Sequence, residues 1–378
     1  MSEHRHPESP LLDHCPETLP REAYLDAGWF DREMATVWAR NWVCVGRLTD
    51  FAAGAMRPVP VGGASVIVAR AADGVISAFH NACRHRGAEI CAAEVAVGKL
   101  ITCPYHAWAY AASDGRLVST AHATPTEDFD KQAHGLRSVS HAVWNGFVFL
   151  NRSRTPGPLS PDLGVGALDN WPMDGLVTGH RHERVLACNW KVFWENYNEC
   201  LHCPGIHPEL CDMVPVYAKG IMSASEAVDW DGEKPPGNLK PGAQSWTMTG
   251  APCGPVFAGL TAEQRQDGYT FVTFYPTAYV VAHVDYVRCV RLEPIGPQET
   301  RLVAEWYFSP ETLAQPRFDA ADVAAFAKIV LGQDGDAAEM NQRGIRSPSY
   351  RRGRLMPQEF DIHRYHNWVL SEMESQND

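Results

Sequence analysis

Residues 83–108, CRHRGAEICAAEVAVGKLITCPYHAW, contain two short segments that each pair one thiol with one imidazole. Cys83 and His85 have the spacing C-x-H, and Cys103 and His106 have the spacing C-x-x-H. Two cysteines and two histidines are a ligand set for tetrahedral zinc. Zinc modules more often take one residue type from each loop. One Cys and one His per loop instead favour a 2Fe–2S cluster in which cysteines bind one iron and histidines bind the other.

Short β-branched segments surround these two loops, for example ASVIVARA at 64–71 and NGFVFLN at 145–151. Gly, Pro and Asp-Gly signals separate them, which is typical of antiparallel strands joined by tight turns. We therefore predict a small antiparallel β-domain over residues 42–155. Residues 1–41 are predicted to form an N-terminal arm with helices that pack on the body, and residues 156–378 a second domain.

The second domain carries longer strand-like segments and a helical run. YTFVTFY (269–275), AYVVAHVDYVRCVRLEPI (278–295) and TRLVAEWYF (300–308) predict strands, and residues 319–343 predict a helix followed by an irregular tail. Strands and helices that do not alternate indicate an α+β domain with an antiparallel sheet flanked by helices.

Composition limits the classes of partner. The chain has 378 residues, 45% of them apolar, and a net charge of −12. This acidity argues against a nucleic-acid or anionic-membrane surface. The first twenty residues lack a basic segment followed by an apolar one, and no later run approaches eighteen apolar residues, so we expect neither secretion nor a membrane span. The eleven cysteines are an odd number scattered through a long chain, so we expect a reducing compartment, the cytoplasm.

A second candidate metal site lies at 189–210, NWKVFWENYNECLHCPGIHPEL. Imidazole plus carboxylate is the ligand set that non-haem iron prefers. On an unbroken helix His202 and His207 would point about 140° apart, because five residues turn the chain by about 500°. Pro204 and Gly205 predict that the helix ends after Cys203, which lets the two imidazoles converge. Glu199 is either a ligand or an acceptor that holds an imidazole. The competing interpretation is a buried amphipathic helix with incidental histidines.

Cys200 and Cys203 form a C-x-x-C pair within this stretch. No βαβ pattern surrounds them, so we do not expect a redox-active dithiol there.

The two cysteine–histidine loops match the signature C-x-H…C-x-x-H of the Rieske proteins. Together with E-x-x-H-x-x-x-x-H at 199–207, they resemble the catalytic (alpha) subunit of a Rieske non-haem iron oxygenase. The resemblance implies an α+β fold with an N-terminal Rieske β-domain and a C-terminal catalytic domain of helix-grip, START-like type. It also implies a 2Fe–2S cluster on Cys83, His85, Cys103 and His106.

The same resemblance implies a mononuclear Fe(II) bound by His202, His207 and a third ligand from GQDGDAAEMNQRGIRS (332–347). The spacing to the NQ-x-G motif assigns that ligand to Asp334 and leaves Asp336 as a solvated charge. Glu199 corresponds to the residue that carries electrons between neighbouring subunits. The family implies a homotrimer that uses O2 and electrons from NAD(P)H through a flavin/iron–sulfur reductase, since no G-x-G-x-x-G follows a strand here.

Three stretches resemble the branch that oxidises glycine betaine, proline betaine, carnitine or choline: residues 189–210, 283–308 and 333–350. Leu201 departs from the Tyr that is common there. The branch implies hydroxylation of an N-methyl group and release of formaldehyde. The alternative is an aromatic-ring hydroxylating dioxygenase or an O-demethylase of an aromatic acid.

A trimethylammonium group favours aromatic walls. The candidates for such walls are Trp194, Tyr197, Phe271, Phe274, Tyr275, Tyr279 and Trp306. A substrate carboxylate would need a cation or donors, for which His283, Arg288 and Arg291 are unranked candidates.

Overall fold

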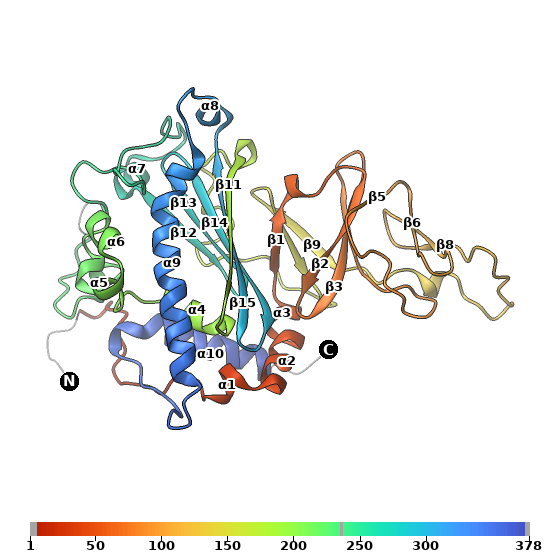
Figure 1. The fold of residues 1–378 in the computed structure, drawn as a ribbon, viewed down its shortest axis with the longest axis horizontal. Coiled ribbons are helices and arrows are strands. Elements are labelled where there is room, and N and C mark those ends of the chain that lie inside the picture. The colour runs from red at the N-terminus through yellow and green to blue at the C-terminus, as the bar shows by residue number, and fades with distance from the viewer. Residues whose placement is uncertain (1–5, 235–236, 375–378) are drawn as a thin grey trace. The chain divides into compact units, whose positions relative to one another are not determined.

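The computed structural model describes residues 6–234 and 237–374 (Figure 1). These residues form two compact units. The small unit contains residues 33–160, and the large unit contains residues 6–32 and 161–374. Within this described part of the chain, no helix combines the length and the apolarity that a membrane span requires.

The small unit is built from three antiparallel sheets, ordered β1-β10-β9, β4-β3-β2-β5 and β6-β7-β8. Two of its hairpins have two-residue turns with positive φ at both positions, Gly62-Gly63 and Asn145-Gly146. That backbone matches the twist of paired strands and favours Gly and Asn. Its elements are α3 (Val37–Arg40), β1 (Val43–Arg47), η1 (Leu48–Asp50), β2 (Ala55–Val61), β3 (Ala64–Arg70), β4 (Ile76–His80), β5 (Val95–Ala96), β6 (Leu100–Thr102), β7 (Ala109–Ala111), β8 (Leu117–Ser119), η2 (Gln132–His134), β9 (Ser140–Trp144) and β10 (Phe147–Asn151).

The large unit contains one five-stranded antiparallel sheet, ordered β11-β15-β14-β13-β12. The long helix α9 lies against α4 and β11 (Figure 1). Its strands are β11 (Val177–Leu186), β12 (Tyr269–Phe274), β13 (Ala278–His283), β14 (Val287–Gly296) and β15 (Glu299–Phe308). Its helices are α1 (Glu22–Leu25), η3 (Met173–Gly175), α4 (Trp190–Tyr197), α5 (Cys203–Ile206), α6 (Pro208–Met213), η4 (Tyr217–Lys219), η5 (Ala224–Glu226), α7 (Ala262–Asp267), α8 (Pro310–Leu313), α9 (Ala320–Ile345), η6 (Pro357–Glu359) and α10 (Phe360–Glu374), and α2 (Ala27–Ala35) runs across the boundary between the units. The predicted α+β class is confirmed.

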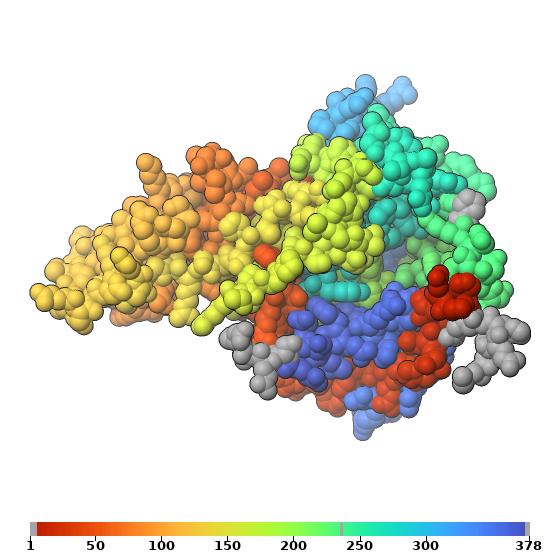
Figure 2. Space-filling model, turned by 180° about the vertical axis from the view of Figure 1, so that it is seen from behind, coloured from red at the N-terminus to blue at the C-terminus, as the bar shows by residue number. Residues whose placement is uncertain are grey.

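The N-terminal arm is held by the end of the chain. Thr18 N–H donates to the Gly353 carbonyl at 3.2 Å, and Leu355 N–H donates to the Pro16 carbonyl at 2.9 Å. Figure 2 shows these first residues beside the C-terminal segment on one face of the large unit. The tail predicted as irregular is wrong in one respect, because residues 360–374 form helix α10.

The five-stranded sheet decides which side chains can share a cavity. Successive side chains of a strand point to opposite faces, so residues two apart share a face. Phe271 of β12 pairs with Val281 of β13, and Val281 pairs with Arg288 of β14. These three residues therefore lie on one face. Arg291 lies on the other face, because it is three residues beyond Arg288.

Candidate functional site

Two loops of the same shape hold the cysteines and histidines of the small unit. The Gly87 N–H donates to the Cys83 carbonyl at 2.9 Å. The Ala107 N–H donates to the Cys103 carbonyl at 3.1 Å. Both donors have positive φ, 79° at Gly87 and 55° at Ala107. Only Gly adopts this region without strain, so Ala107 is an unusual residue held there by its surroundings.

The four donor groups are divided by type. Cys83 and Cys103 are buried at 4% and 1% exposure, and they lie beside each other in the core of the small unit. His85 is exposed and His106 half-buried, with their Nδ1 atoms 3.3 Å apart. Two ligands on one tetrahedral metal with bonds of about 2.1 Å would be about 3.4 Å apart. Paired thiols inside and paired imidazoles outside fit the 2Fe–2S cluster of the sequence prediction.

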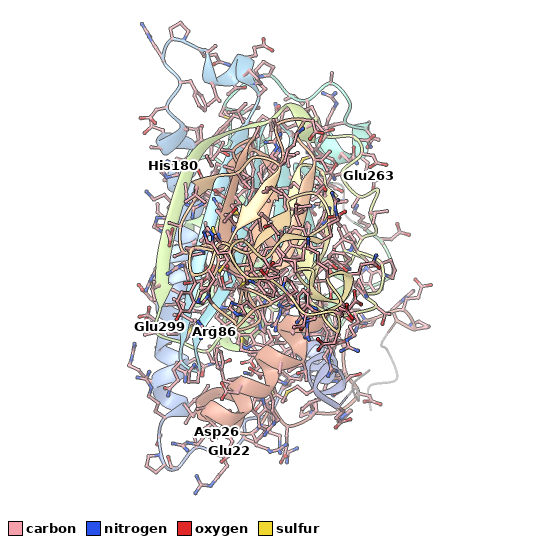
Figure 3. All side chains as sticks on the ribbon, turned by 90° about the vertical axis from the view of Figure 1, so that its right-hand side faces the viewer. Glu22, Asp26, Arg86, His180, Glu263 and Glu299 are labelled. Atoms are coloured by element: carbon pink, nitrogen blue, oxygen red, sulfur yellow. A yellow bond between two sulfur atoms is a disulfide. The ribbon has the colours of Figure 1, made fainter. Side chains whose placement is uncertain are left out.

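Side chains around the two loops complete the environment of the cluster ligands. Trp108 stacks on His85 with 4.8 Å between ring centroids. Arg86, labelled in Figure 3, places a guanidinium nitrogen 2.7 Å from His106 Nε2. Desolvation, then the charges of Arg86 and His85, lower the pKa of His106. The imidazole is therefore neutral over a wide pH range, as a metal ligand must be.

Sequence analysis missed Tyr110, whose hydroxyl lies 3.1 Å from the Cys83 sulfur and accepts from the Arg84 N–H at 3.0 Å. Burial and the Cys83 contact raise the pKa of Tyr110, so the phenol stays protonated and donates to the sulfur. A hydrogen bond to a cluster thiolate stabilises the reduced cluster.

We expect Tyr110→Phe to lower the cluster reduction potential by about 40–60 mV, the one-electron equivalent of about 1–1.4 kcal/mol for one lost hydrogen bond. Redox titration followed by visible absorption measures this shift. A matched Tyr105→Phe variant should leave the potential unchanged, because Tyr105 is 62% exposed and contacts the ring of His106 rather than a sulfur. An unchanged potential in the Tyr110 variant would remove this hydrogen bond from the account.

The second candidate site lies in the large unit, in the turn after α4. Helix α4 ends at Tyr197 and α5 begins at Cys203, so the helix does not continue to Cys203 as predicted. The predicted break at Pro204 and Gly205 is also wrong, because both lie inside α5. Proline is tolerated in the first turn of a helix, where its missing N–H has no helical partner. His202 precedes α5 and His207 joins α5 to α6, and this compact turn brings their imidazoles together.

Three donor atoms converge there. His202 Nε2 lies 3.2 Å from His207 Nε2. Asp334 Oδ1, from the middle of α9, lies 2.9 Å from His207 Nε2 and 3.5 Å from His202 Nε2. Ligands in adjacent positions of one metal with bonds of about 2.1 Å are about 3.0 Å apart. The three atoms therefore fit one face of an octahedral non-haem iron and leave the opposite face for other ligands.

A carboxylate and an amide group contact the Nδ1 atoms of the two imidazoles, the ring nitrogens that are not among the three donor atoms. Glu199 Oε1 lies 2.6 Å from His202 Nδ1. Gln333 Oε1 lies 2.8 Å from His207 Nδ1, and the Gln333 amide donates to Glu209 at 3.1 Å. With the proton on Nδ1, each Nε2 keeps its lone pair for a metal. Sequence analysis missed Gln333 and Glu209, although Gln333 is adjacent to Asp334.

Burial opposes protonation of His202, but hydrogen bonds with Asp334 and Glu199 outweigh it and raise its pKa to about 9. Burial also disfavours the charged form of Asp334 and so raises its pKa. Hydrogen bonds and charge interactions with the two histidines outweigh burial, so the net shift of the Asp334 pKa is downward. These shifts reflect a site in which negative charge accumulates. A divalent cation bound by the same three groups would satisfy that charge.

The two aspartates of this segment, Asp334 and Asp336, have different surroundings in the structure. Asp336 has a side chain that is 75% exposed and pairs with Arg184 at 2.7 Å. Asp334 faces the two histidines instead. Of the two, Asp334 is therefore the candidate ligand.

Cys203 lies near the metal donors, with its sulfur 3.9 Å from His202 Nε2. It forms a disulfide with Cys200, a pairing that sequence analysis did not predict. A disulfide sulfur carries no thiolate charge for a metal. We therefore choose Asp334 rather than Cys203 as the third donor.

A cavity of about 760 Å³ opens onto these donors, entirely within the large unit. Its lining includes four of the predicted aromatic residues, Tyr197, Phe271, Tyr275 and Tyr279, and it includes Arg288. Trp194, Phe274, Trp306, His283 and Arg291 are not among the lining residues. The lining residues that sequence analysis did not name as candidates include Trp246, Tyr269, Tyr365 and Trp368, the last two from α10.

Comparison with known proteins matches each unit to a family. Residues 41–130 match the Rieske [2Fe-2S] domain, and residues 173–375 match the ring hydroxylating alpha subunit (catalytic domain). The chain is 31% identical to the glycine betaine monooxygenase oxygenase subunit of Chromohalobacter salexigens, covering 96% of this chain and 87% of that protein. It is 26% identical to the chloroplastic choline monooxygenase of Spinacia oleracea, covering 93% of this chain and 77% of that protein.

A solved structure shares the fold. The quaternary ammonium Rieske monooxygenase CntA in complex with its substrate L-carnitine superimposes with a TM-score of 0.66 at 20% identity, covering 98% of this chain and 99% of that one. The two matched domains follow each other in the order in which the two sets of candidate donor residues occur along the chain. The chain belongs to the Rieske non-haem iron oxygenase family, as a catalytic alpha subunit with a 2Fe–2S domain and a mononuclear iron domain.

Proposed function

We propose that this chain is the oxygenase component of a monooxygenase that removes an N-methyl group from a quaternary ammonium substrate. The observation that carries the proposal is the aromatic cavity beside His202, His207 and Asp334. The relatives named for glycine betaine and choline support the same substrate class.

The cavity wall suits a cation that cannot donate a hydrogen bond. The rings of Tyr197, Phe271 and Tyr279 form a group, with centroids 4.3 Å apart between the two tyrosines and 6.1 Å apart between Tyr197 and Phe271. A quaternary ammonium binds to aromatic faces by cation–π attraction of roughly 0.5–2 kcal/mol for each ring. The Asp162 and Asp361 carboxyls also line the cavity, and burial raises the pKa of each. The wall therefore offers a methylated ammonium both aromatic faces and, when they are ionised, two carboxylates.

The proposed reaction consumes dioxygen, two electrons and two protons for each methyl group. One oxygen atom enters a C–H bond of the N-methyl group and the other leaves as water. The resulting N-hydroxymethyl ammonium breaks its C–N bond, which releases formaldehyde, the tertiary amine and one proton. Iron bound by His202, His207 and Asp334 would supply dioxygen activation, and the 2Fe–2S cluster would supply single electrons.

The chain's own residues position the reactants. Glu199 and Gln333 fix the tautomers of the two histidines, and the aromatic wall holds the ammonium in the cavity beside them. We further propose that Glu199 links the site to the cluster of a neighbouring subunit in a homotrimer, and that a separate flavin/iron–sulfur reductase delivers electrons from NAD(P)H.

Chemically reduced protein tests the proposal without an identified reductase. The protein is exposed to O2 with glycine betaine, carnitine, choline or benzoate, and formaldehyde and the demethylated amine are quantified. We expect formaldehyde with at least one trimethylammonium compound, in equal amount to the demethylated amine. Product from benzoate and no formaldehyde from any methylammonium compound would instead indicate an oxygenase for aromatic acids.

A further inference from the structure

Arg288 is a buried cation without a carboxylate partner. It is 3% exposed, and its Nε and Nη1 atoms have no hydrogen-bond partner among residues 6–234 and 237–374. Its guanidinium carbon lies 6.0 Å from the Trp246 ring, at the outer limit of a cation–π contact. A buried charge without a partner is strongly unfavourable. The cavity that Arg288 lines is therefore where its partner belongs.

Arg291 shows how the same strand satisfies a cation that has no role in the cavity. Its guanidinium binds Glu305 at 2.9 Å, and the other Glu305 oxygen binds Arg181 at 2.8 Å. Arg291 lies on the opposite face of the sheet, since it is three residues from Arg288. The sheet thus neutralises Arg291 of β14, whereas Arg288 on the cavity side pairs with no carboxylate of the described residues.

The other cations of the cavity already have partners. Lys234 pairs with Glu263 at 3.1 Å and with Asp267 at 3.0 Å, and its side chain is 62% exposed. Arg364 pairs with Asp361 at 2.9 Å and is 69% exposed. An anion in the cavity would have to displace a carboxylate from either residue, whereas Arg288 lines the cavity and no ion pair between it and a carboxylate is found among the described residues.

A second orphan donor lies beside Arg288. Trp246 lines the same cavity, and its buried Nε1–H also has no partner among the described residues. A carboxylate has two oxygens and accepts hydrogen bonds from both a guanidinium fork and a neighbouring N–H. Arg288 and Trp246 together provide that set of donors.

The candidate iron ligands and Arg288 lie around the same aromatic group. Tyr279 lines the same cavity as Arg288 and Asp334, and its ring centroid lies 4.3 Å from that of Tyr197. When the ammonium of a substrate lies on the aromatic wall, the opposite end of the substrate therefore remains in the cavity that Arg288 lines.

We propose that Arg288 and Trp246 form the subsite that binds the carboxylate of the substrate. The substrate is then a zwitterion with a quaternary ammonium and a carboxylate, rather than an alcohol such as choline, which has no carboxylate. This inference rests on the proposed function and narrows its substrate class. Arg288 is the specificity-determining residue, and the aromatic wall serves either class of trimethylammonium compound.

The test compares glycine betaine, its neutral amide and choline in calorimetric titrations of the iron-loaded protein without oxygen. Wild-type protein should bind glycine betaine at least about 10-fold more tightly than the amide or choline, since a hydrogen bond to a charged group contributes about 1.5–3 kcal/mol. Arg288→Gln should weaken glycine betaine binding by about 10- to 150-fold and change choline binding by less than about 3-fold. The KM for formaldehyde release should rise in parallel while kcat changes little.

Arg288→Lys and Arg291→Gln are the matched variants. Lysine keeps the charge without the planar fork, so its effect should be intermediate. Arg291→Gln, on the opposite face, should retain the preference for glycine betaine. The comparison of glycine betaine with its amide uses wild-type protein. It therefore shows whether the cavity prefers a carboxylate even if Arg288→Gln fails to fold.

The possible results separate the two proposals. Equal affinity of wild-type protein for glycine betaine, its amide and choline, with formaldehyde released, would overturn the carboxylate subsite and leave the proposed function standing. The same holds if Arg288→Gln weakens all three ligands equally. Absence of formaldehyde from every methylammonium compound would overturn the proposed function. In that case, weakened binding of benzoate to Arg288→Gln would still support an anion subsite, and unchanged binding would remove it.

Discussion

Asp334→Asn is expected to abolish turnover and to leave the visible absorption of the cluster intact. Asp334 Oδ1 is one of three donor atoms within 3.5 Å of one another, and an amide oxygen is a much weaker ligand than a carboxylate. We expect activity to fall by more than about 100-fold, because even the outer-shell partners of metal ligands typically contribute 10- to 100-fold. Iron analysis, cluster absorption and formaldehyde release measure the three consequences.

Asp336→Asn is the matched control on the same helix. Asp336 pairs with Arg184 at the surface, and such pairs contribute about 0–1 kcal/mol to stability. Its iron content and turnover should equal those of the wild type. His207→Ala should repeat the Asp334 result, since His207 is buried at the same site. Full turnover in either the Asp334 or the His207 variant would contradict the candidate ligand set.

Glu199→Gln is expected to retain both metal centres while steady-state turnover falls by about 100-fold. Glutamine still offers an oxygen to His202 Nδ1, so the tautomer and the iron ligand geometry should survive. The change removes the charge of the carboxylate, through which we propose that electrons pass from a neighbouring subunit. Rapid-mixing absorbance should show that a reduced cluster is no longer reoxidised by O2 in the presence of substrate.

Gln333→Glu provides the comparison for Glu199, since Gln333 holds the other histidine. This variant retains an oxygen that can accept from His207 Nδ1. In the native protein, Gln333 Oε1 lies 2.8 Å from that nitrogen. It should alter iron affinity without blocking cluster reoxidation. Normal steady-state rates in Glu199→Gln would reduce Glu199 to a structural partner of His202, and rapid cluster reoxidation would do the same.

The candidate metal donors could be singled out from the sequence because the spacing of ligands along a chain is restricted. The two loops at Cys83 and Cys103 each contain one thiol and one imidazole, which few other sites combine. His202 and His207 were singled out by residue type together with the upstream motif. The local backbone was not predicted correctly. The helix ends at Tyr197, and Asn198 accepts a hydrogen bond from the Tyr275 hydroxyl of a distant segment, whereas Pro204 and Gly205 lie inside α5.

The substrate cavity was less predictable because its walls come from distant segments. Arg288 and Arg291 are both basic residues in an apolar strand, and the sequence does not reveal which face of the sheet meets the cavity. Register with Val281 and the position of Glu305 separate them only in three dimensions. Helix α10 was missed for a similar reason: its apolar residues contact partners far away in the sequence, including Tyr365 against Tyr275.

Metal and sulfide analysis of the purified chain, after anaerobic reconstitution with ferrous iron, tests most directly whether it carries two different iron centres. We predict about three irons and about two acid-labile sulfides per chain, with two irons and both sulfides in the cluster and one iron at His202, His207 and Asp334. Asp334→Asn should lose one iron and no sulfide. Zinc in place of iron, or catalytically active protein with no more than two irons per chain, would contradict the account.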